Sequence, residues 1–162
     1  MRHANMKNSQ QGIALLEALI ALLIFSLGIL GLVGLQSLSI KNSTDAKYRA
    51  DAAFLANQII SQIWADLPSN SLSAAGQAVL GAYAHRPTAG ANVCSPAGSA
   101  SGNGNVTAWI TEVSRVLPGA STTNQQITVN AATGAVTVTV CWRANQETAD
   151  HNHVVSAQLV KN

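Results

Sequence analysis

The chain has 162 residues, of which 48% are hydrophobic and only 10% are charged, and its formal net charge is +2. An ordinary soluble domain carries about 25% charged residues, so either the surface is unusually neutral or part of the chain avoids water. The weak net charge argues against a nucleic-acid-binding protein, and the high apolar content argues against a disordered chain.

Residues 13–35 form an almost continuous apolar run, IALLEALIALLIFSLGILGLVGL, and no charged side chain occurs from Ala18 to Ile40. As a helix the run is about 34 Å long, which is enough to cross the hydrocarbon core of a bilayer. A core helix of a soluble domain is the alternative, but the rest of the chain could not easily enclose so long a run. We therefore predict a membrane-spanning helix.

The flanks of this run predict its orientation. The preceding segment, MRHANMKNSQQG, contains Arg2 and Lys7 and no acidic residue. Positive residues stay in the cytoplasm, so we expect the N-terminus inside and residues 41–162 outside. Cys94 and Cys141 lie in that outer part, and an even pair in an oxidising compartment predicts a disulfide, with two buried free thiols as the alternative.

Glu17 is the one acidic residue of the apolar run. A carboxylate costs about 2.5–3.5 kcal/mol at the centre of a membrane helix and less near its end, so Glu17 is a candidate functional residue. A plain single-span anchor leaves this residue unexplained. A cleaved secretion signal would have a shorter apolar core followed by a small-x-small site, whereas this run continues into LVGLQSLSIKNS.

The sequence GIALLE at residues 12–17 resembles the class III signal of type IV prepilins, in which a basic leader ends in glycine and the mature chain has glutamate at its fifth place. The resemblance implies that prepilin peptidase cuts between Gly12 and Ile13 and methylates the amine of Ile13. It also implies that Glu17 attracts the N-terminal ammonium of a neighbouring subunit. The family usually has Phe or Met where this chain has Ile13.

Electrostatics is consistent with the role that the resemblance implies for Glu17. Other helices replace the solvent in a filament core, so an ammonium within about 4 Å interacts with a carboxylate far more strongly than in water. Only one stagger of neighbouring subunits satisfies both charges. The pair would therefore fix the axial register of the subunits.

The apolar run also looks like the start of PilV-type minor pilins, whose helix has regularly placed glycines and a trailing Leu-Gln. Gly28, Gly31 and Gly34 recur here at every third residue. Two interpretations stay open. The glycines permit close helix packing or local unwinding in a filament, or they reflect the ordinary glycine content of membrane helices.

Helical spacing continues through residues 37–67 but becomes amphipathic, with one apolar stripe formed by Tyr48, Ala52, Leu55, Ile59, Ile63 and Leu67. Pro68 ends the pattern. We predict one helix from about Ile13 to Asp66, about 80 Å long, with residues 13–36 apolar on all sides. A helix that lies half in lipid and half against a domain is the pilin architecture.

Residues 68–123 are predicted to connect this helix to a C-terminal sheet. Weak helical spacing between Leu72 and Tyr83 favours a short helix, and the tract SPAGSASGNGN is typical of a flexible loop. Segment 105–117 has the β-branched residues of a strand but the apolar spacing of a helix. We predict a short helix there, with Asn105 as its N-cap.

Residues 124–162 are predicted to form an antiparallel sheet of three to four strands. Apolar alternation predicts strands around Ile127, from Ala135 to Arg143 and from about His153 to Val160. With the long helix this predicts an α+β protein, and the resemblance implies the type IV pilin fold.

Few residues suggest other chemistry. Asp150, His151 and His153, with Glu147, are a candidate zinc site, but zinc needs three or four converging ligands, and we favour a polar hairpin turn between two strands. His85 is interpreted as loop surface. The chain contains no nucleophile elbow, no HExxH motif and no phosphate-binding glycine loop, so we predict neither a cofactor nor an enzyme.

The resemblance implies a minor type IV pilin that packs residues 13–36 against equivalent helices, primes polymerisation of the major pilin, and supports adhesion and twitching motility. The implied partners are other minor pilins, the major pilin, prepilin peptidase, the inner-membrane assembly platform and a tip adhesin. The implied location is the bacterial inner membrane, with residues 41–162 in the periplasm, and then the pilus fibre or tip. A minor pseudopilin of a type II secretion system and, more remotely, a single-span periplasmic binding protein are the alternatives.

Overall fold

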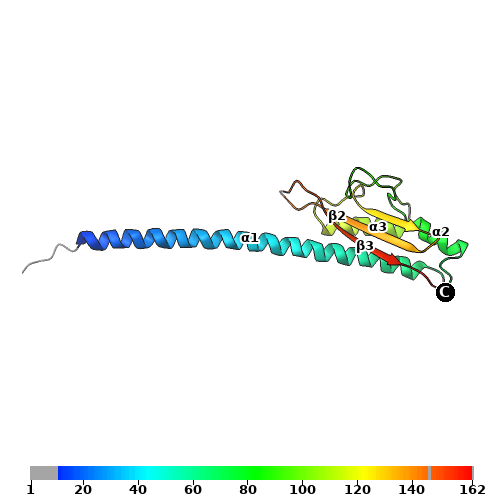
Figure 1. Ribbon diagram of the computed structural model, residues 1–162, viewed down its shortest axis with the longest axis horizontal. Coiled ribbons are helices and arrows are strands. Elements are labelled where there is room, and N and C mark those ends of the chain that lie inside the picture. The colour runs from blue at the N-terminus through cyan, green and yellow to red at the C-terminus, as the bar shows by residue number, and fades with distance from the viewer. Residues whose placement is uncertain (1–10, 146, 162) are drawn as a thin grey trace, which may run out of the picture. The chain divides into compact units, whose positions relative to one another are not determined.

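The structure is a computed structural model that describes residues 11–145 and 147–161 (Figure 1). The chain divides into two units, Met1–Thr44 and Asp45–Asn162, and helix α1 contributes to both. The elements, in chain order, are α1 (Gln11–Asp66), α2 (Ala74–Ala82), α3 (Gly104–Val116), β1 (Gln126–Asn130), β2 (Ala135–Trp142) and β3 (His151–Gln158). The predicted α+β fold, with a long N-terminal helix and an antiparallel sheet, is confirmed.

Helix α1 runs without a break to Asp66, two residues before Pro68. Within the second unit one face of the helix is buried, and its core positions are Ala52, Leu55, Ala56, Ile59 and Ile63. All of them except Ala56 belong to the predicted apolar stripe. Of its other two members, Leu67 is buried just past the helix end and Tyr48 is only partly buried. Residues three and four apart lie on the same side of a helix, which is why the spacing predicted the buried face.

The sheet has the strand order β1-β2-β3, and both pairs are antiparallel. The turn between β1 and β2 closes through a hydrogen bond in which the Gly134 N–H donates to the Asn130 carbonyl at 2.8 Å. Gly134 has φ +75°, and a Cβ at this position would lie 2.6 Å from the carbonyl oxygen of Leu159. Only glycine therefore fits this turn without strain.

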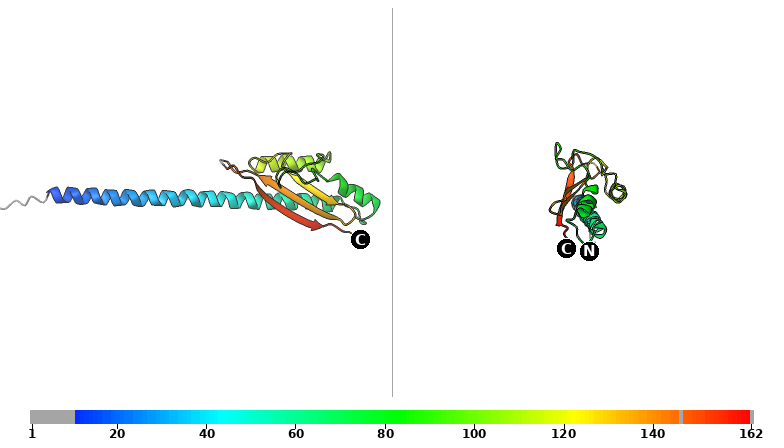
Figure 2. Two further views of the ribbon diagram at one scale, coloured as in Figure 1. Left: turned by 45° about the horizontal axis from the view of Figure 1, so that its top comes forward. Right: turned by 90° about the vertical axis from the view of Figure 1, so that its right-hand side faces the viewer.

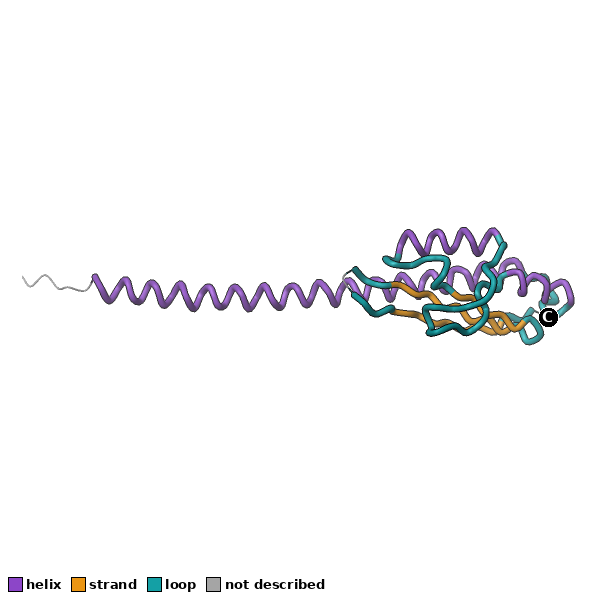
Figure 3. The backbone as a smooth tube through the Cα atoms, turned by 90° about the horizontal axis from the view of Figure 1, so that it is seen from above, coloured by secondary structure: helices purple, strands orange, loops and turns teal. Residues whose placement is uncertain are grey.

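The core lies between one face of the sheet and the helices. Val136, Val138, Val140 and Trp142 of β2 are buried in one cluster with residues of α1 and α3. Figure 2 shows the strands of the sheet beside α1 and α3. Thr139 and Cys141, which point to the opposite face of β2, are also buried. Loop segments, coloured teal in Figure 3, account for much of the chain between α2 and β1.

The two short helices lie in the segment that was predicted to connect helix and sheet. Ser73 caps α2, and its side chain accepts a hydrogen bond from the Gly76 N–H. The N-cap of α3 is Asn103, so the expectation of Asn105 was wrong. The Asn103 side chain accepts a hydrogen bond from the Asn105 N–H at 2.8 Å, which satisfies a donor in the first turn that has no partner inside the helix.

Two expectations about histidines were also wrong. His85 is 1% exposed and does not lie on a loop surface, because its backbone pairs with Ile127 at the edge of β1. The polar turn between the last two strands was expected at residues 150–153, but the connection ends before His151. Residues 151–153 belong to β3, which begins early because His151 pairs with Trp142 in the register and stacks on its ring.

Candidate assembly segment

The first described unit is an isolated apolar helical segment. Every residue from Ile13 to Ile40 is exposed, and the exposed fractions of Ile13, Phe25 and Leu35 are 69%, 65% and 67%. Among the described residues, α1 is the one helix long and apolar enough to span a membrane. An apolar surface of this extent is far larger than that of a soluble monomer, so it needs lipid or other helices around it.

Glu17 lies in the middle of an apolar stripe on this helix. A shallow groove is lined by Glu17 together with Ile13, Leu16, Ile20, Ala21 and Ile24. These positions lie within three helical turns on one side of the helix. Among the residues that the structure describes, no side chain forms an ion pair with Glu17. The pairing of this carboxylate with an ammonium of another subunit therefore stays a prediction.

The predicted cleavage site lies at the edge of the described region. Ile13 is a described residue of α1, and Gly12 falls within the bounds of the same helix. Most of the predicted leader, with Arg2 and Lys7, lies outside the described residues. Cleavage after Gly12 and methylation of Ile13 therefore stay predictions.

The three regularly spaced glycines are not required by packing within this chain. A Cβ placed on Gly28, Gly31 or Gly34 would meet no atom within 4 Å. Both interpretations of their spacing consequently stay open, and only contacts with other molecules could distinguish them. The Ser26 hydroxyl nearby donates a hydrogen bond to the Leu22 carbonyl, so this polar group is satisfied within the helix.

A disulfide joins Cys94 to Cys141, with an S–S distance of 2.00 Å and 5.6 Å between the Cα atoms. It ties the loop before α3 to the face of β2 opposite the helices. Gln125 fixes the same point, because its side chain accepts a hydrogen bond from the Cys141 N–H and donates one to the Cys141 carbonyl, both at 2.9 Å. The bridge is buried, with Cys94 6% exposed and Cys141 0% exposed.

Three of the four candidate zinc ligands pair with other protein groups. His151 shares a hydrogen bond with Glu147, while Asp150 accepts one from the Arg143 guanidinium at 2.9 Å. No three His, Cys, Asp or Glu residues in the described part of the chain are grouped in a way that could hold a metal ion.

Sequence reasoning missed a polar cluster at the end of α1. The Tyr83 hydroxyl donates a hydrogen bond to Asp66, and the Asn105 amide donates to both groups, each at 2.9 Å. Burial, followed by the hydrogen bond with Asp66, raises the pKa of Tyr83 above its usual value. The cluster joins three helical segments, and no local periodicity could have predicted it because its members are far apart in sequence.

Comparison with known proteins bears on the N-terminal segment. Residues 7–33 match the family model of the prokaryotic N-terminal methylation motif. Neither the curated proteins nor the solved structures yielded a match to the chain. The matched segment contains Gly12, Ile13 and Glu17, and its described part is the exposed apolar helix. The chain thus carries a type IV prepilin-like methylation motif, which supports its placement among type IV pilins and pseudopilins.

Proposed function

We propose that this protein is a minor type IV pilin of the PilV type that helps to prime pilus assembly. The observation that carries the proposal is Glu17, a carboxylate without an intrachain ion pair among the described residues, on an exposed apolar helix inside the methylation motif. Such an arrangement is costly unless a cation is brought to it. A single-span binding protein would have no use for it.

Cleavage would supply that cation. Cutting after Gly12 frees the amine of Ile13, which remains a cation after methylation, at the start of the mature helix. In the proposed assembly step the ammonium of one subunit lies against Glu17 of its neighbour, and residues 13–36 of the two subunits pack side by side. Both charges are then paired in an apolar medium, where their attraction is strong.

The proposed partners are other minor pilins and the major pilin, with prepilin peptidase and the inner-membrane assembly platform acting earlier. The protein would span the inner membrane once, with residues 41–162 in the periplasm, before it enters the pilus fibre or its tip beside an adhesin. Adhesion and twitching motility would depend on it indirectly, through the number of pili.

The N-terminus provides the first test. Mass spectrometry of the protein from cells with active prepilin peptidase should find Ile13 as the first residue, with an added methyl group. The Glu17→Ala variant should be cleaved normally but excluded from filaments, because the incoming ammonium loses its partner. Ser26→Ala is the matched control, since it alters a polar residue on the same helix without removing a charge. An intact Met1, or normal incorporation of Glu17→Ala, would contradict the proposal.

A deletion strain separates the pilus from type II secretion, whose minor pseudopilins carry an indistinguishable N-terminal signal. Surface pili and secreted enzymes should be counted in the same cells. Loss of pili with normal secretion is the expected result. Normal pili with failed secretion would assign the protein to the secretion apparatus.

A further inference from the structure

The two edges of the sheet differ in how far the chain itself covers them. The edge at β1 is partly closed, because the His85 N–H donates to the Ile127 carbonyl at 3.0 Å and the Ile127 N–H donates back at 2.9 Å. The Gln126 side chain beside it donates to the Arg86 carbonyl at 2.8 Å. At the other edge lies β3, whose one neighbour in the sheet is β2, and Figure 2 shows it in red as the outermost strand.

The register of β2 and β3 determines which backbone groups face this open edge. The Leu159 N–H donates to the Gly134 carbonyl at 2.8 Å, just past the end of β3. Backbone groups of successive residues in a strand point to opposite sides, so odd-numbered residues of β3 face β2 and even-numbered residues face outwards. Among the described residues, none forms a backbone hydrogen bond with the outward N–H and carbonyl groups of Asn152, Val154 and Ser156.

The β3 edge lacks the devices that usually keep a sheet edge unpaired. Exposed edges in natural proteins commonly carry lysine, proline or a bulge. The sequence of β3, HNHVVSAQ, contains no lysine, arginine, acidic residue or proline, and its pairing with β2 is continuous over residues 151–158. Eight residues of strand are about 26 Å long. The edge is therefore able to accept another strand along its whole length.

A groove on the outer face of the sheet adjoins the same edge, and we call it the sheet groove. It is lined by Gln126 of β1, Thr139 of β2 and Val154 of β3, together with residues of the loop before α3 that include Val93 and Pro96. Val93 is 53% exposed and Val154 is 48% exposed. The volume of the sheet groove is about 460 Å³, whereas an apolar cavity of about 150 Å³ accommodates benzene. The sheet groove thus has room for an apolar side chain.

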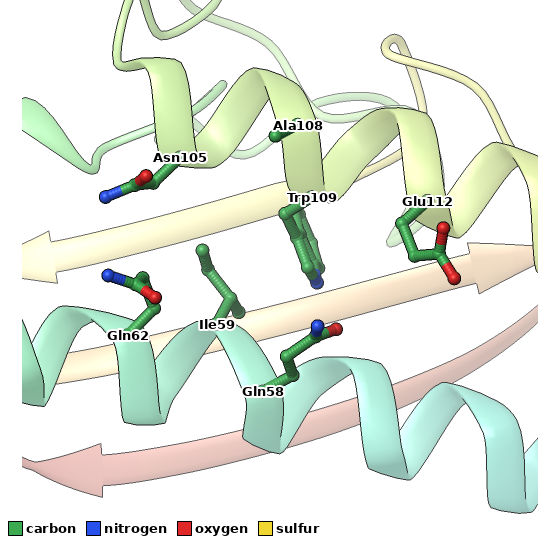
Figure 4. A pocket seen from close by; sticks show the side chains of 7 residues that line it. All are labelled: Gln58, Ile59, Gln62, Asn105, Ala108, Trp109 and Glu112. Carbon is green, nitrogen blue, oxygen red and sulfur yellow. The ribbon is translucent and has the colours of Figure 1, made fainter.

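The groove between α1 and α3 differs, because polar side chains at its rim are paired within the chain (Figure 4). The Trp109 indole N–H donates to the Leu55 carbonyl at 2.8 Å. The Gln62 and Asn105 amides both donate to Asp66. These contacts identify no occupant for that groove, whereas a row of unpaired N–H and carbonyl groups identifies an extended backbone as the occupant of the β3 edge.

The direction of the added strand follows from the exposure of the outer face. Parallel pairs occur almost only in sheets that are covered on both faces, whereas Asn152, Val154 and Ser156 are exposed, so an antiparallel strand is favoured. Within the second unit β3 runs in the same direction as α1 (Figure 1). Two copies that span the membrane in one orientation therefore hold their β3 strands parallel, a step that rests on the proposed function. The antiparallel strand must come from a different protein.

We propose that β3 accepts an antiparallel strand of a different protein and that the sheet groove binds an apolar side chain of that strand. A residue opposite Val154 lies on the same face as Val154, about 5 Å from it, so its side chain reaches the sheet groove. Backbone hydrogen bonds supply the affinity of such a contact, and the side chain in the groove supplies its specificity. The residue opposite Val154 is therefore β-branched or aromatic.

Photo-cross-linking of the full chain in cells tests the proposal. The probe is p-benzoylphenylalanine in place of Asn152, whose side chain is exposed on the outer face of β3. Irradiation should join the chain to a different protein, and mass spectrometry should locate the cross-link in an extended segment with an apolar residue opposite Val154. A product that contains two copies of this chain, a cross-link to a helical segment, or the absence of a product would overturn the proposal.

A proline variant tests whether backbone groups make the contact. Ser156→Pro removes an outward N–H and leaves the hydrogen bonds to β2 intact, and proline is tolerated at such positions of an edge strand. It should lower the yield of the cross-linked product roughly tenfold, because the added strand loses a hydrogen bond and meets the proline ring. Ser156→Ala is the matched control, since both variants lose the contact between the Ser156 and Thr137 hydroxyls at 2.8 Å. Equal yields from the two variants would contradict pairing through the backbone.

A misfolded variant is recognised by its disulfide. Both Ser156 variants should form the Cys94–Cys141 bridge, as shown by non-reducing mass analysis. If Ser156→Pro does not, Val154→Lys takes its place, because it adds to an exposed position the charge that natural edges use against pairing. Its yield should also fall roughly tenfold, and an unchanged yield would overturn the proposal.

Hydrogen exchange distinguishes an added strand from other contacts. In the cross-linked product the amides of Val154, Ser156 and Gln158 should exchange at least roughly tenfold more slowly than in the free chain in detergent. The amides of His153 and Val155, which face β2, should exchange slowly in both. Outward amides that exchange equally fast in the two samples would overturn the proposal.

N-terminal processing separates this inference from the proposed function. If Ile13 is the first residue and Glu17→Ala is excluded from filaments, but the probe at Asn152 gives no product, the strand inference is wrong and the assembly function stands. If Met1 stays intact in cells with active prepilin peptidase and the probe still joins a strand of a different protein, the assembly function is wrong and the role of the β3 edge stands.

Discussion

At the scale of single residues, Tyr83 shows how burial and a nearby carboxylate act together. Its phenol donates to Asp66 and lies in the core, and both effects favour the neutral form and raise the pKa of Tyr83. A group whose pKa is higher in the folded state contributes stability below its unfolded pKa, about 10 for tyrosine, and that stability is lost as the pH rises through the folded pKa.

We therefore predict that the free energy of unfolding of the parent chain falls at alkaline pH as Tyr83 ionises, and that the Tyr83→Phe variant lacks this contribution. At pH 7 this variant should lower the free energy of unfolding by about 1 kcal/mol, the typical net value of one hydrogen bond. Above pH 10 the difference from the parent chain should shrink. Urea unfolding of the full chain in detergent, followed by near-ultraviolet circular dichroism, measures both effects. Tyr48→Phe, at the second tyrosine, is the control, and a difference that grows above pH 10 would contradict the argument.

His85 illustrates a residue whose role no local pattern reveals. The Ser101 N–H donates to its Nδ1 atom at 3.1 Å, so the proton is on Nε2, which donates to the Thr122 carbonyl at 3.0 Å. The ring thereby joins the segment before α3 to the segment before β1. Sequence analysis placed His85 on a loop surface because the residues that satisfy it are 16 and 37 positions away.

At the scale of elements, the C-terminus of the chain closes the end of α1. The Lys161 ammonium donates to the Leu67 carbonyl at 2.8 Å and lies over the Trp64 ring at 5.1 Å from its centroid. The Lys161 N–H also donates to the Ser71 hydroxyl at 2.8 Å. A cation at this end of a helix is favourable because the last carbonyls carry partial negative charge.

We predict that Lys161→Met lowers the free energy of unfolding by about 1 kcal/mol, because the helix end and the Trp64 ring both lose their cation. Lys161→Arg is the matched control and should cost less, since it keeps the charge. Hydrogen exchange should show faster opening of the last turn of α1 in the methionine variant. Equal protection in the two variants would mean that the cation does not stabilise this helix end.

Elements also differ in how well their sequences predict them. Helix α1 and strand β2 were predictable because residues adjacent in sequence determine their periodicity and their buried face. Helix α3 was ambiguous, since its β-branched residues also suit a strand, and its N-cap was misplaced by two residues. A long-range contact favours the helix here, because Trp109 is buried against α1. The intrinsic helix or strand propensity of a residue does not include such a contact.

At the scale of the whole molecule, the Cys94–Cys141 disulfide constrains the longest irregular segment of the second unit. The two cysteines are separated by 47 positions, and the chain-entropy model assigns about 4 kcal/mol to closing a loop of that size. Because the bridge is buried, dithiothreitol should reduce it slowly in the folded protein and quickly in urea.

We predict that the double variant Cys94→Ala/Cys141→Ala loses about 4 kcal/mol of unfolding free energy relative to the oxidised chain. Urea unfolding of the two proteins measures the loss. The parent chain reduced in urea and alkylated should resemble the double variant, which serves as the check that bridge loss causes the change. An unchanged unfolding midpoint would mean that hydrogen bonds such as those from Gln125 hold this loop without the disulfide.

By itself, the sequence determined the apolar helix, its amphipathic continuation, the strands and the methylation motif with Glu17, because each depends on the order and spacing of neighbouring residues. Only the tertiary structure decided the surroundings of His85, the Asp66–Tyr83–Asn105 cluster and the groove between α1 and α3. Each of these joins segments that are distant along the chain, and which distant residues meet depends on how helices and strands share one core.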